Sequence, residues 1–393
     1  MHKLSTTSLI ILFCILIPFI GFAQGQARAP WYNFDFAYTS DFVRNFNGGK
    51  ATGGAFLGMG QLGLTLNTTK MGLWRNGEIF LHGLLTHGDC PSQDLIGDFQ
   101  VASNIDAGYY PGLFEFWYRH QIGSKLTILA GQHDLNADFV VCETAGLFLN
   151  SAFGIHSSIS LNVPVSIFPV AALGLMADYK ISKNFNLKAG IYDGDPGDTE
   201  SNKYNLQIGL GRNEGSFRIG EIAWNFGGKL KSEFKTGGYW HSGSFTSFSD
   251  PELVYENNYG TYLIVDQQLW QSNEESSTRS INSFLQVGWS PEDRSSNQYY
   301  LGGGITLQDL LGKNQVDIIG LSFAHASFAT PFTRSLSSEI NPIDAETAVE
   351  LTWQLMLLPY LVIQPDLQYI FNPGLNGNDN ALAGIFRTYW TFL

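Results

Sequence analysis

Residues 114–119 place an aromatic ring between two opposite charges on one face of an extended chain. They read Phe-Glu-Phe-Trp-Tyr-Arg, and because successive side chains of a strand point to opposite faces, Glu115, Trp117 and Arg119 share a face. An indole ring stacks on an apolar ligand surface, while a carboxylate and a guanidinium offer charged hydrogen bonds to hydroxyl groups. The segment therefore predicts a binding surface for a hydroxylated ligand. The alternative is a Glu–Arg pair on a polar wall, with Trp117 as packing.

Two carboxylates farther along the chain are candidates for the same surface. Asp134 and Asp138 lie in the run Gly-Gln-His-Asp-Leu-Asn-Ala-Asp-Phe (131–139), near the end of a predicted strand. Their side chains either point toward the ligand surface or hold a turn by accepting hydrogen bonds from backbone N–H groups. Both interpretations are compatible with the sequence.

Other chemistry-bearing residues do not form a catalytic or metal-binding set. His82 and His87 are five residues apart, so in a strand they point to opposite faces and do not share a metal. Asp193, Asp195 and Asp198 resemble a short calcium loop, but the glycines and proline among them favour a tight turn. The sequence also lacks a Gly-rich phosphate loop and a convincing Ser-His-Asp set, and the neighbouring pair at 274–275 (Glu-Glu) is typical of a solvated loop. We therefore predict no catalytic residue, no metal, no cofactor and no enzymatic activity.

The elements that must position these residues show a recurring period of two. Phe185, Leu187, Ala189 and Ile191 alternate with polar or small residues, and similar runs occupy 206–210, 348–357 and 361–371. This period is typical of strands with one apolar and one polar face. The predicted apolar faces consist of Phe114, Phe116 and Tyr118 in one strand, of Tyr299, Leu301, Gly303, Ile305 and Leu307 in a second, and of Val349, Leu351, Trp353, Leu355 and Leu357 in a third. The predicted polar face of the third strand consists of Ala348, Glu350, Thr352, Gln354 and Met356.

The N-terminus resembles a secretory signal peptide. Lys3 precedes an apolar core at 9–22, and small residues at Gly21 and Ala23 predict cleavage before Gln24. An uncleaved anchor is the alternative. Residues 24–393 would then form a single domain, which retains Cys90 and Cys142, either paired in an oxidising compartment or free.

Composition favours a membrane barrel over a protein folded in water. Charged residues make up 15% of the chain, against about 25% in soluble domains, while the chain has 43 glycines and 14% aromatic residues. The formal charge of −13 excludes a basic nucleic-acid binder. At about 23 residues per strand with its connection, residues 24–393 make about 16 transmembrane antiparallel strands around a water-filled lumen.

The chain end has the alternating aromatics of an outer-membrane barrel. Phe386, Trp390 and Phe392 share one phase, as expected of a last strand read by the barrel-assembly machinery, and Leu393 extends one residue beyond it. A soluble β-sandwich has similar alternation, because its apolar faces pack against a second sheet. The low charge, the absence of a domain break and this chain end favour the barrel.

A series of collinear blocks resembles the carbohydrate-selective porin family (OprB-like). The blocks are Thr-His-Gly-Asp-Cys-Pro-Ser (86–92), Asp-Phe-Gln-Val-Ala-Ser-Asn-Ile-Asp (98–106), Phe-Glu-Phe-Trp-Tyr (114–118), the 131–139 run, Ala-Gly-Leu-Phe-Leu-Asn-Ser-Ala-Phe-Gly (145–154), Gly-Ile-Tyr-Asp-Gly-Asp-Pro-Gly (190–197) and Ile-Gln-Pro-Asp-Leu-Gln-Tyr-Ile-Phe-Asn-Pro-Gly (363–374). The resemblance covers about residues 38–392. Cys90, Cys142 and Leu393 depart from the family pattern.

The resemblance implies a barrel porin of 16 strands in the outer membrane of a Gram-negative bacterium, surrounded by lipid. Sugars, as mono- or oligosaccharides, would diffuse passively through its lumen past Glu115, Trp117, Arg119, Asp134 and Asp138. Barrels of this size occur as monomers and homotrimers, and the sequence is compatible with both. The alternatives are an exported β-sandwich that binds polysaccharide or hydrolyses glycosides, and a barrel selective for another solute.

Overall fold

The computed structural model describes residues 30–197, 202–207, 209, 211, 214–228, 230–274, 277–312, 316–336, 343–375 and 377–392. The predicted signal peptide (1–23), Asp198, Glu275 and Leu393 lie outside these residues. In the described part of the chain, no helix combines the length and the apolar character needed to cross a membrane.

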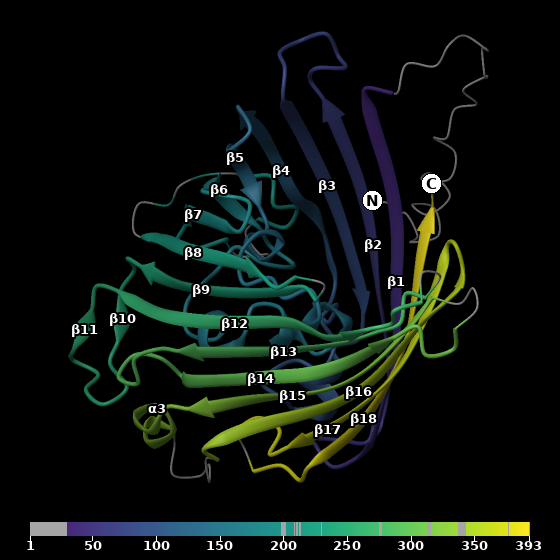
Figure 1. Cartoon of the computed structure of the whole chain (residues 1–393). Coiled ribbons are helices and arrows are strands. Elements are labelled where there is room, and N and C mark those ends of the chain that lie inside the picture. Colours follow the sequence, from purple (N-terminus) through teal and green to yellow (C-terminus); the bar gives the residue numbers. More distant parts are fainter. Residues whose placement is uncertain are drawn as a thin grey trace, which may run out of the picture.

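Sixteen antiparallel strands of the described chain close into one barrel, as predicted (Figure 1). Closure occurs where β1 pairs with both β2 and β18, for example at Phe42, which faces Phe56 and Phe386. A closed barrel has no second sheet, so the β-sandwich alternative is excluded. The wall strands are β1 (Tyr32–Asn47), β2 (Gly53–Asn67), β3 (Gly77–Gly88), β4 (Tyr110–Ile122), β5 (Leu126–His133), β6 (Ala172–Lys180), β7 (Phe185–Asp193), β8 (Ser216–Phe226), β9 (Ser232–His241), β12 (Asn258–Gln271), β13 (Ser280–Trp289), β14 (Asn297–Gln308), β15 (Asp317–Phe328), β16 (Ala345–Leu358), β17 (Leu361–Phe371) and β18 (Ala381–Phe392).

The connections differ at the two ends of the barrel. At the end where β1 begins and β18 ends, which we call the turn end, β4 and β5 are joined by residues 123–125 and β16 and β17 by residues 359–360. The opposite end, which we call the loop end, has long connections at 89–109, 134–171 and 194–215. It also has the hairpin of β10 (Phe245–Thr246) and β11 (Val254–Tyr255) and the helix α3 (Thr330–Ser335), at the rim in Figure 1. Short turns at one end and long loops at the other are typical of outer-membrane barrels.

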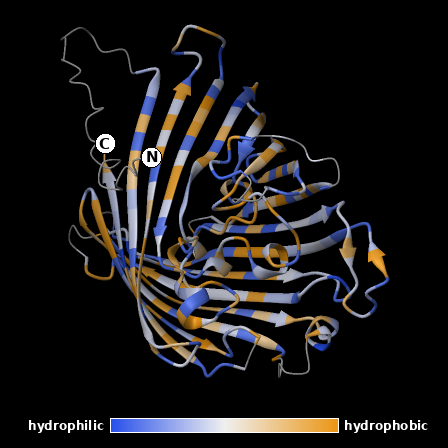
Figure 2. Cartoon of the chain, turned by 180° about the vertical axis from the view of Figure 1, so that it is seen from behind, coloured by the Kyte–Doolittle hydropathy of each residue, from blue (hydrophilic) through white to orange (hydrophobic). Residues whose placement is uncertain are grey.

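The outer surface of the wall is apolar, as the period of two predicts. Phe185, Leu187 and Ile191 of β7 are exposed on the outside, and so are Tyr299, Leu301 and Ile305 of β14. Figure 2 shows the resulting bands of hydrophilic and hydrophobic residues along the strands. At the chain end Phe386 and Phe392 are also exposed, and Phe392 stacks on Phe36 of β1.

The sequence pattern and the structure differ at two places, the inward or outward phase of β4 and the run at 206–210. In β4, Phe114 lies in a bulge opposite His82 and Gly83, which turns its ring into the barrel, where it is 5% exposed. In β16 the register agrees with the prediction, because Met356 pairs with the cavity-lining Val362 on the inner face and Leu355 pairs with Asp317 on the outer face, although Leu355 is buried and Met356 is exposed. In the run at 206–210, the described residues Leu206, Gln207 and Gly209 are not in the expected strand but in the connection between β7 and β8, and Ile208 and Leu210 lie outside the described residues.

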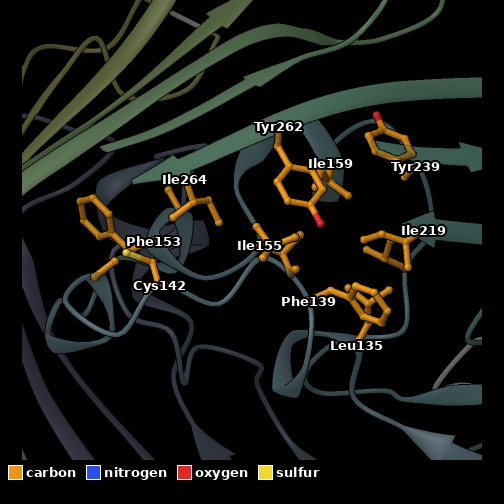
Figure 3. Close-up of a cluster of buried hydrophobic side chains, with 14 of the residues drawn as sticks. Leu135, Phe139, Cys142, Phe153, Ile155, Ile159, Ile219, Tyr239, Tyr262 and Ile264 are labelled. Atoms are coloured by element: carbon orange, nitrogen blue, oxygen red, sulfur yellow. The ribbon is translucent and has the colours of Figure 1, made fainter. Parts of the chain in front are cut away.

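Two long loops fold back into the barrel and fill much of its interior. The 134–171 loop, the longer of the two, contains η2 (Leu135–Ala137), η3 (Ala145–Leu147), η4 (Ser151–Phe153) and α2 (Ser157–Ser160). Its Phe139, Phe153 and Ile159 join a buried cluster with inward side chains such as Ile219 of β8 and Tyr262 of β12 (Figure 3). The 89–109 loop, with η1 (Ser92–Ile96), contributes Ile96 and Ile105 to a second cluster against β1, β2 and β18. The sequence period did not reveal which connections fold inward.

Candidate functional site

Carboxylates of the inner wall hold the 134–171 loop in place. Glu350 of β16 accepts hydrogen bonds from the backbone N–H groups of Leu149 (2.6 Å) and Asn150 (3.1 Å). On the opposite wall, Glu221 of β8 accepts from the N–H of Val140 at 3.0 Å. A buried N–H group left without an acceptor is costly, so wall carboxyl oxygens that accept from loop N–H groups define the loop position.

Asp266 of β12 forms a third anchor of this loop. It accepts from the backbone N–H of Thr144 at 2.9 Å and from the Thr144 hydroxyl at 2.6 Å. The Cys142 thiol lies beside it at 3.4 Å, and burial, together with the Asp266 charge, raises the pKa of this thiol. Cys142 and Cys90 are both free, so the disulfide considered from the sequence does not form in this structure.

The 89–109 loop is anchored in the same way, partly on the same strand β16. Glu346 of β16 accepts from the N–H groups of Phe99 (2.7 Å) and Gln100 (2.9 Å). Asp41 of β1 accepts from the Ser103 hydroxyl at 2.6 Å and forms a two-pronged ion pair with Arg387 of β18, with both contacts at 2.7 Å. The loop is therefore joined to β1, β16 and β18, far from it in sequence.

Between the loops and the wall lies a cavity of about 870 Å³. Its wall side is formed by β1, β2, β16–β18 and Phe114 of β4, and its loop side by both inserted loops. The wall contributes Thr39, Met59, Gln61, Gln354, Val362, Gln364, Arg387 and Tyr389. The loops contribute polar groups, including Asn104, Asp106, Asp134, Asn136 and Asn150, and aromatic rings, including Phe99, Phe148, Phe153 and Phe168. The cavity thus combines hydrogen-bonding groups with aromatic surface.

Two neighbouring side chains of β18 face this cavity from the wall. Arg387 is held by Asp41, and Tyr389, two residues on, is 37% exposed. Sequence reasoning missed both. The signal was present, because the period of two that places Phe386, Trp390 and Phe392 outward also places Arg387 and Tyr389 inward.

The structure brings Glu115, Trp117 and Arg119 together on the inner face of β4. The Trp117 indole N–H donates to Glu115 at 3.2 Å, and the Arg119 guanidinium lies 4.5 Å from the centre of the Trp117 ring. The ring is 8% exposed and packs on Phe80 of β3, with 5.0 Å between ring centres. These three residues are not among those that line the cavity.

Glu115 instead contacts the start of the inserted 134–171 loop. Its carboxylate accepts from the backbone N–H of Asp134 at 3.1 Å, while His82 lies 3.2 Å from its other oxygen. His82 therefore points inward, and His87 points outward beside Tyr38, on opposite faces as predicted. Within the described residues, no three His, Cys, Asp or Glu side chains are arranged to hold a metal ion.

Asp134 both lines the cavity and holds a turn. Its carboxylate accepts from the backbone N–H of Asn136 at 2.9 Å and so caps η2, in agreement with the turn interpretation. Burial, together with the neighbouring Glu115 carboxylate, raises the pKa of Asp134 to about 7. The charge of this cavity residue therefore changes near neutral pH.

Asp138, four residues on, is in a different environment. His133, Lys188 and Arg119 lie 3.1, 3.6 and 3.9 Å from its carboxylate oxygens. Burial acts to raise the pKa of Asp138, but these three neighbours outweigh it and lower the pKa. Asp138 is thus an ionised contact between the loop and strands β4, β5 and β7.

Comparison with known proteins agrees with this architecture. The model of the family described as "Carbohydrate-selective porin, OprB family" matches residues 51–392. The chain is 24% identical over 400 residues to Porin B of Pseudomonas aeruginosa, covering 90% of this chain and 86% of that protein. It is 22% identical to the putative porin QuiX of Acinetobacter baylyi, covering 93% and 90%.

Among solved structures, the high-pH structure of Pseudomonas putida OprB has a similar fold. Its TM-score is 0.83 at 19% sequence identity, and the match covers 92% of this chain and 94% of that chain. The closed barrel and the family match over most of the sequence lead to one assignment. The chain belongs to the carbohydrate-selective porin family, OprB.

Proposed function

We propose that sugars cross the outer membrane passively through the cavity between the inserted loops and strands β1, β2 and β16–β18. The observation that carries this proposal is the composition of the cavity wall. Aromatic rings suit the apolar faces of a pyranose, and charged or amide groups suit its hydroxyls. A volume of about 870 Å³ lies in the range of small-molecule sites, which fits mono- or short oligosaccharides.

Within this proposal, Tyr389, Arg387 and Asp134 contact the passing sugar. Tyr389 supplies a partly exposed ring, and Arg387 and Asp134 supply opposite charges on the wall side and the loop side of the cavity. Weak, replaceable contacts of this kind favour entry without preventing release.

Glu115, Trp117, Arg119 and Asp138 act on the sugar path through the loop. Their hydrogen bonds and ion pairs lie at the base of the 134–171 loop, which forms one side of the cavity. We propose that they set the width of the passage by fixing where this loop begins. They would not contact the sugar themselves.

The proposal includes a passive channel without turnover or cofactor, delivered by a cleaved signal peptide at residues 1–23. Residues 24–393 would act as one domain, either alone or as a homotrimer, after insertion by the barrel-assembly machinery. The wall supports a membrane location, because large apolar side chains are exposed on its outward face over most of the height of the strands.

Swelling of liposomes that contain the purified protein tests the permeation of sugars. Isosmotic glucose and maltose should produce swelling, whereas stachyose, a larger sugar, should enter more slowly. Protein-free liposomes and liposomes with boiled protein serve as controls. Swelling rates for glucose equal to those of the controls would contradict the proposal.

A further inference from the structure

The outer face of β6–β9 contains a hollow that the sugar path does not use. It measures about 640 Å³ and is lined by exposed side chains of all four strands, among them Leu175, Ile191, Arg218 and Trp240. Leu175 pairs with Ile191, Ile191 with Arg218, and Arg218 with Trp240, so these side chains share one outward face. The hollow therefore opens away from the lumen.

Small residues form the floor of this outer groove. Ala177, Ala189, Gly220 and Gly238 face one another on adjacent strands, and a row of larger side chains lies on each side. The row toward the loop end includes Leu175 and Ile191, and the row toward the turn end includes Leu187 and Ile222. Because Gly220 has open space above it, with the nearest atom 4.0 Å from an added Cβ, the floor is depressed between apolar walls.

Arg218 places a positive charge at the edge of the outer groove. Its guanidinium lies 4.7 Å from the centre of the Trp240 ring, and its Nε donates to the Ser216 hydroxyl at 3.2 Å. The side chain is exposed, and among the described residues no carboxylate forms an ion pair with it. Arg218 is the third residue of β8, so it lies near the loop end of the wall.

The outward face of the strands has a distinct charge pattern. In the described strands, the exposed charged side chains in outward register are Arg44 of β1 and Arg218, and both lie near the loop end. The carboxylates in outward register, Asp193 and Asp317, are buried. The chain carries a formal charge of −13, yet its exposed outer wall is positive at this level.

We propose that the outer groove binds an anionic membrane lipid, with an acyl chain over Gly220 and Gly238 and a phosphate on Arg218. The apolar walls suit the chain, and an exposed arginine at the loop end suits a phosphate at headgroup level. A second copy of the protein fits less well, because the described strands offer no exposed outward carboxylate to face Arg218. The inference rests on the membrane location, and it is independent of the sugar path.

Native mass spectrometry of the purified protein in mild detergent tests this proposal. The probes are phosphatidylglycerol and phosphatidylcholine, added separately at equal concentration. Wild-type protein should retain phosphatidylglycerol more than phosphatidylcholine. Arg218→Gln should reduce retained phosphatidylglycerol about fivefold, the loss expected for one arginine at an anionic surface. Gly220→Leu should fill the groove and reduce retention of both lipids about tenfold.

Two matched variants control for general effects on the outer wall. Arg44→Gln removes the other outward charge, and Gly60→Leu adds a side chain at an outward glycine of β2 whose surroundings are equally open. Both should retain lipid as wild type does, and all four variants should keep wild-type glucose swelling rates. Unchanged lipid retention in Gly220→Leu would overturn the proposal. So would dimers or trimers in wild-type protein that Gly220→Leu abolishes, because a second copy would then occupy the groove.

Discussion

Tyr389 is the aromatic side chain of the wall that is most available to a solute in the cavity. It is 37% exposed, whereas Trp117, the ring selected from the sequence, is 8% exposed beneath Arg119. The period of two correctly placed Trp117 on the inner face. This period does not reveal the contacts of Trp117 with Phe80 and His133, because these two rings belong to the neighbouring strands β3 and β5.

Tyr389→Ala should therefore weaken sugar binding more than Trp117→Phe, which preserves an aromatic ring in the packed site. The loss of a stacking contact of about 0.5–1.5 kcal/mol corresponds to an affinity about two- to tenfold lower. The measurement is the glucose concentration that halves the current through the reconstituted channel. Tyr389→Phe is the control and should behave as wild type. Equal affinities for wild type and Tyr389→Ala would remove Tyr389 from the sugar path.

The charge of Asp134 should make ion selectivity depend on pH. Its pKa is raised to about 7, so the carboxyl is mostly protonated at pH 5.5 and ionised at pH 8.5. A negative charge at the cavity attracts cations, so the preference for K⁺ over Cl⁻ should increase as the pH rises through about 7. The reversal potential in a KCl gradient measures this preference. Asp134→Asn should abolish the rise near pH 7, and an identical pH profile in this variant would assign the effect to another group.

At the scale of elements, the strands could be predicted and the inserted loops could not. The alternation of apolar and polar residues within a strand predicts which side chains point inward and which point outward. The register of β7 and β14 confirms this prediction. Bulges such as that at Phe114 reverse the phase locally without changing the composition. Insertion of the 134–171 loop depends on pairing between its backbone and wall carboxylates up to 201 residues away, as at Leu149 and Glu350, and no local pattern encodes this pairing.

Glu350→Ala should release the middle of the 134–171 loop from the wall. Two buried backbone N–H groups lose their acceptor, which weakens the anchoring by about 3 kcal/mol. Single-channel recordings should show a higher and noisier conductance with weaker glucose block. Asp35→Ala is the matched control, because this exposed carboxylate in inward register on β1 forms no hydrogen bond or ion pair with the 134–171 loop among the described residues. A quiet wild-type conductance in Glu350→Ala would show that the loop does not depend on this anchor.

At the scale of the whole molecule, low charge and alternating strands were sufficient to predict the barrel. The apolar outward faces, the short turns at one end and the long loops at the other all belong to this architecture. The position of the proposed sugar path was not predictable, because it is the space that remains after two loops pack against the inner wall. That space lies along β1, β2 and β16–β18, and of the β4 segment 114–119 that the sequence emphasised, Phe114 alone lines it.

Block of single-channel current by sugar tests the central claim most directly. In planar bilayers, the purified wild-type protein should give stepwise conductance, and glucose or maltose at millimolar concentrations should reduce it. This result is expected because a sugar and hydrated ions would share the same cavity. Stepwise conductance that no sugar alters over this concentration range would contradict a sugar path through the cavity.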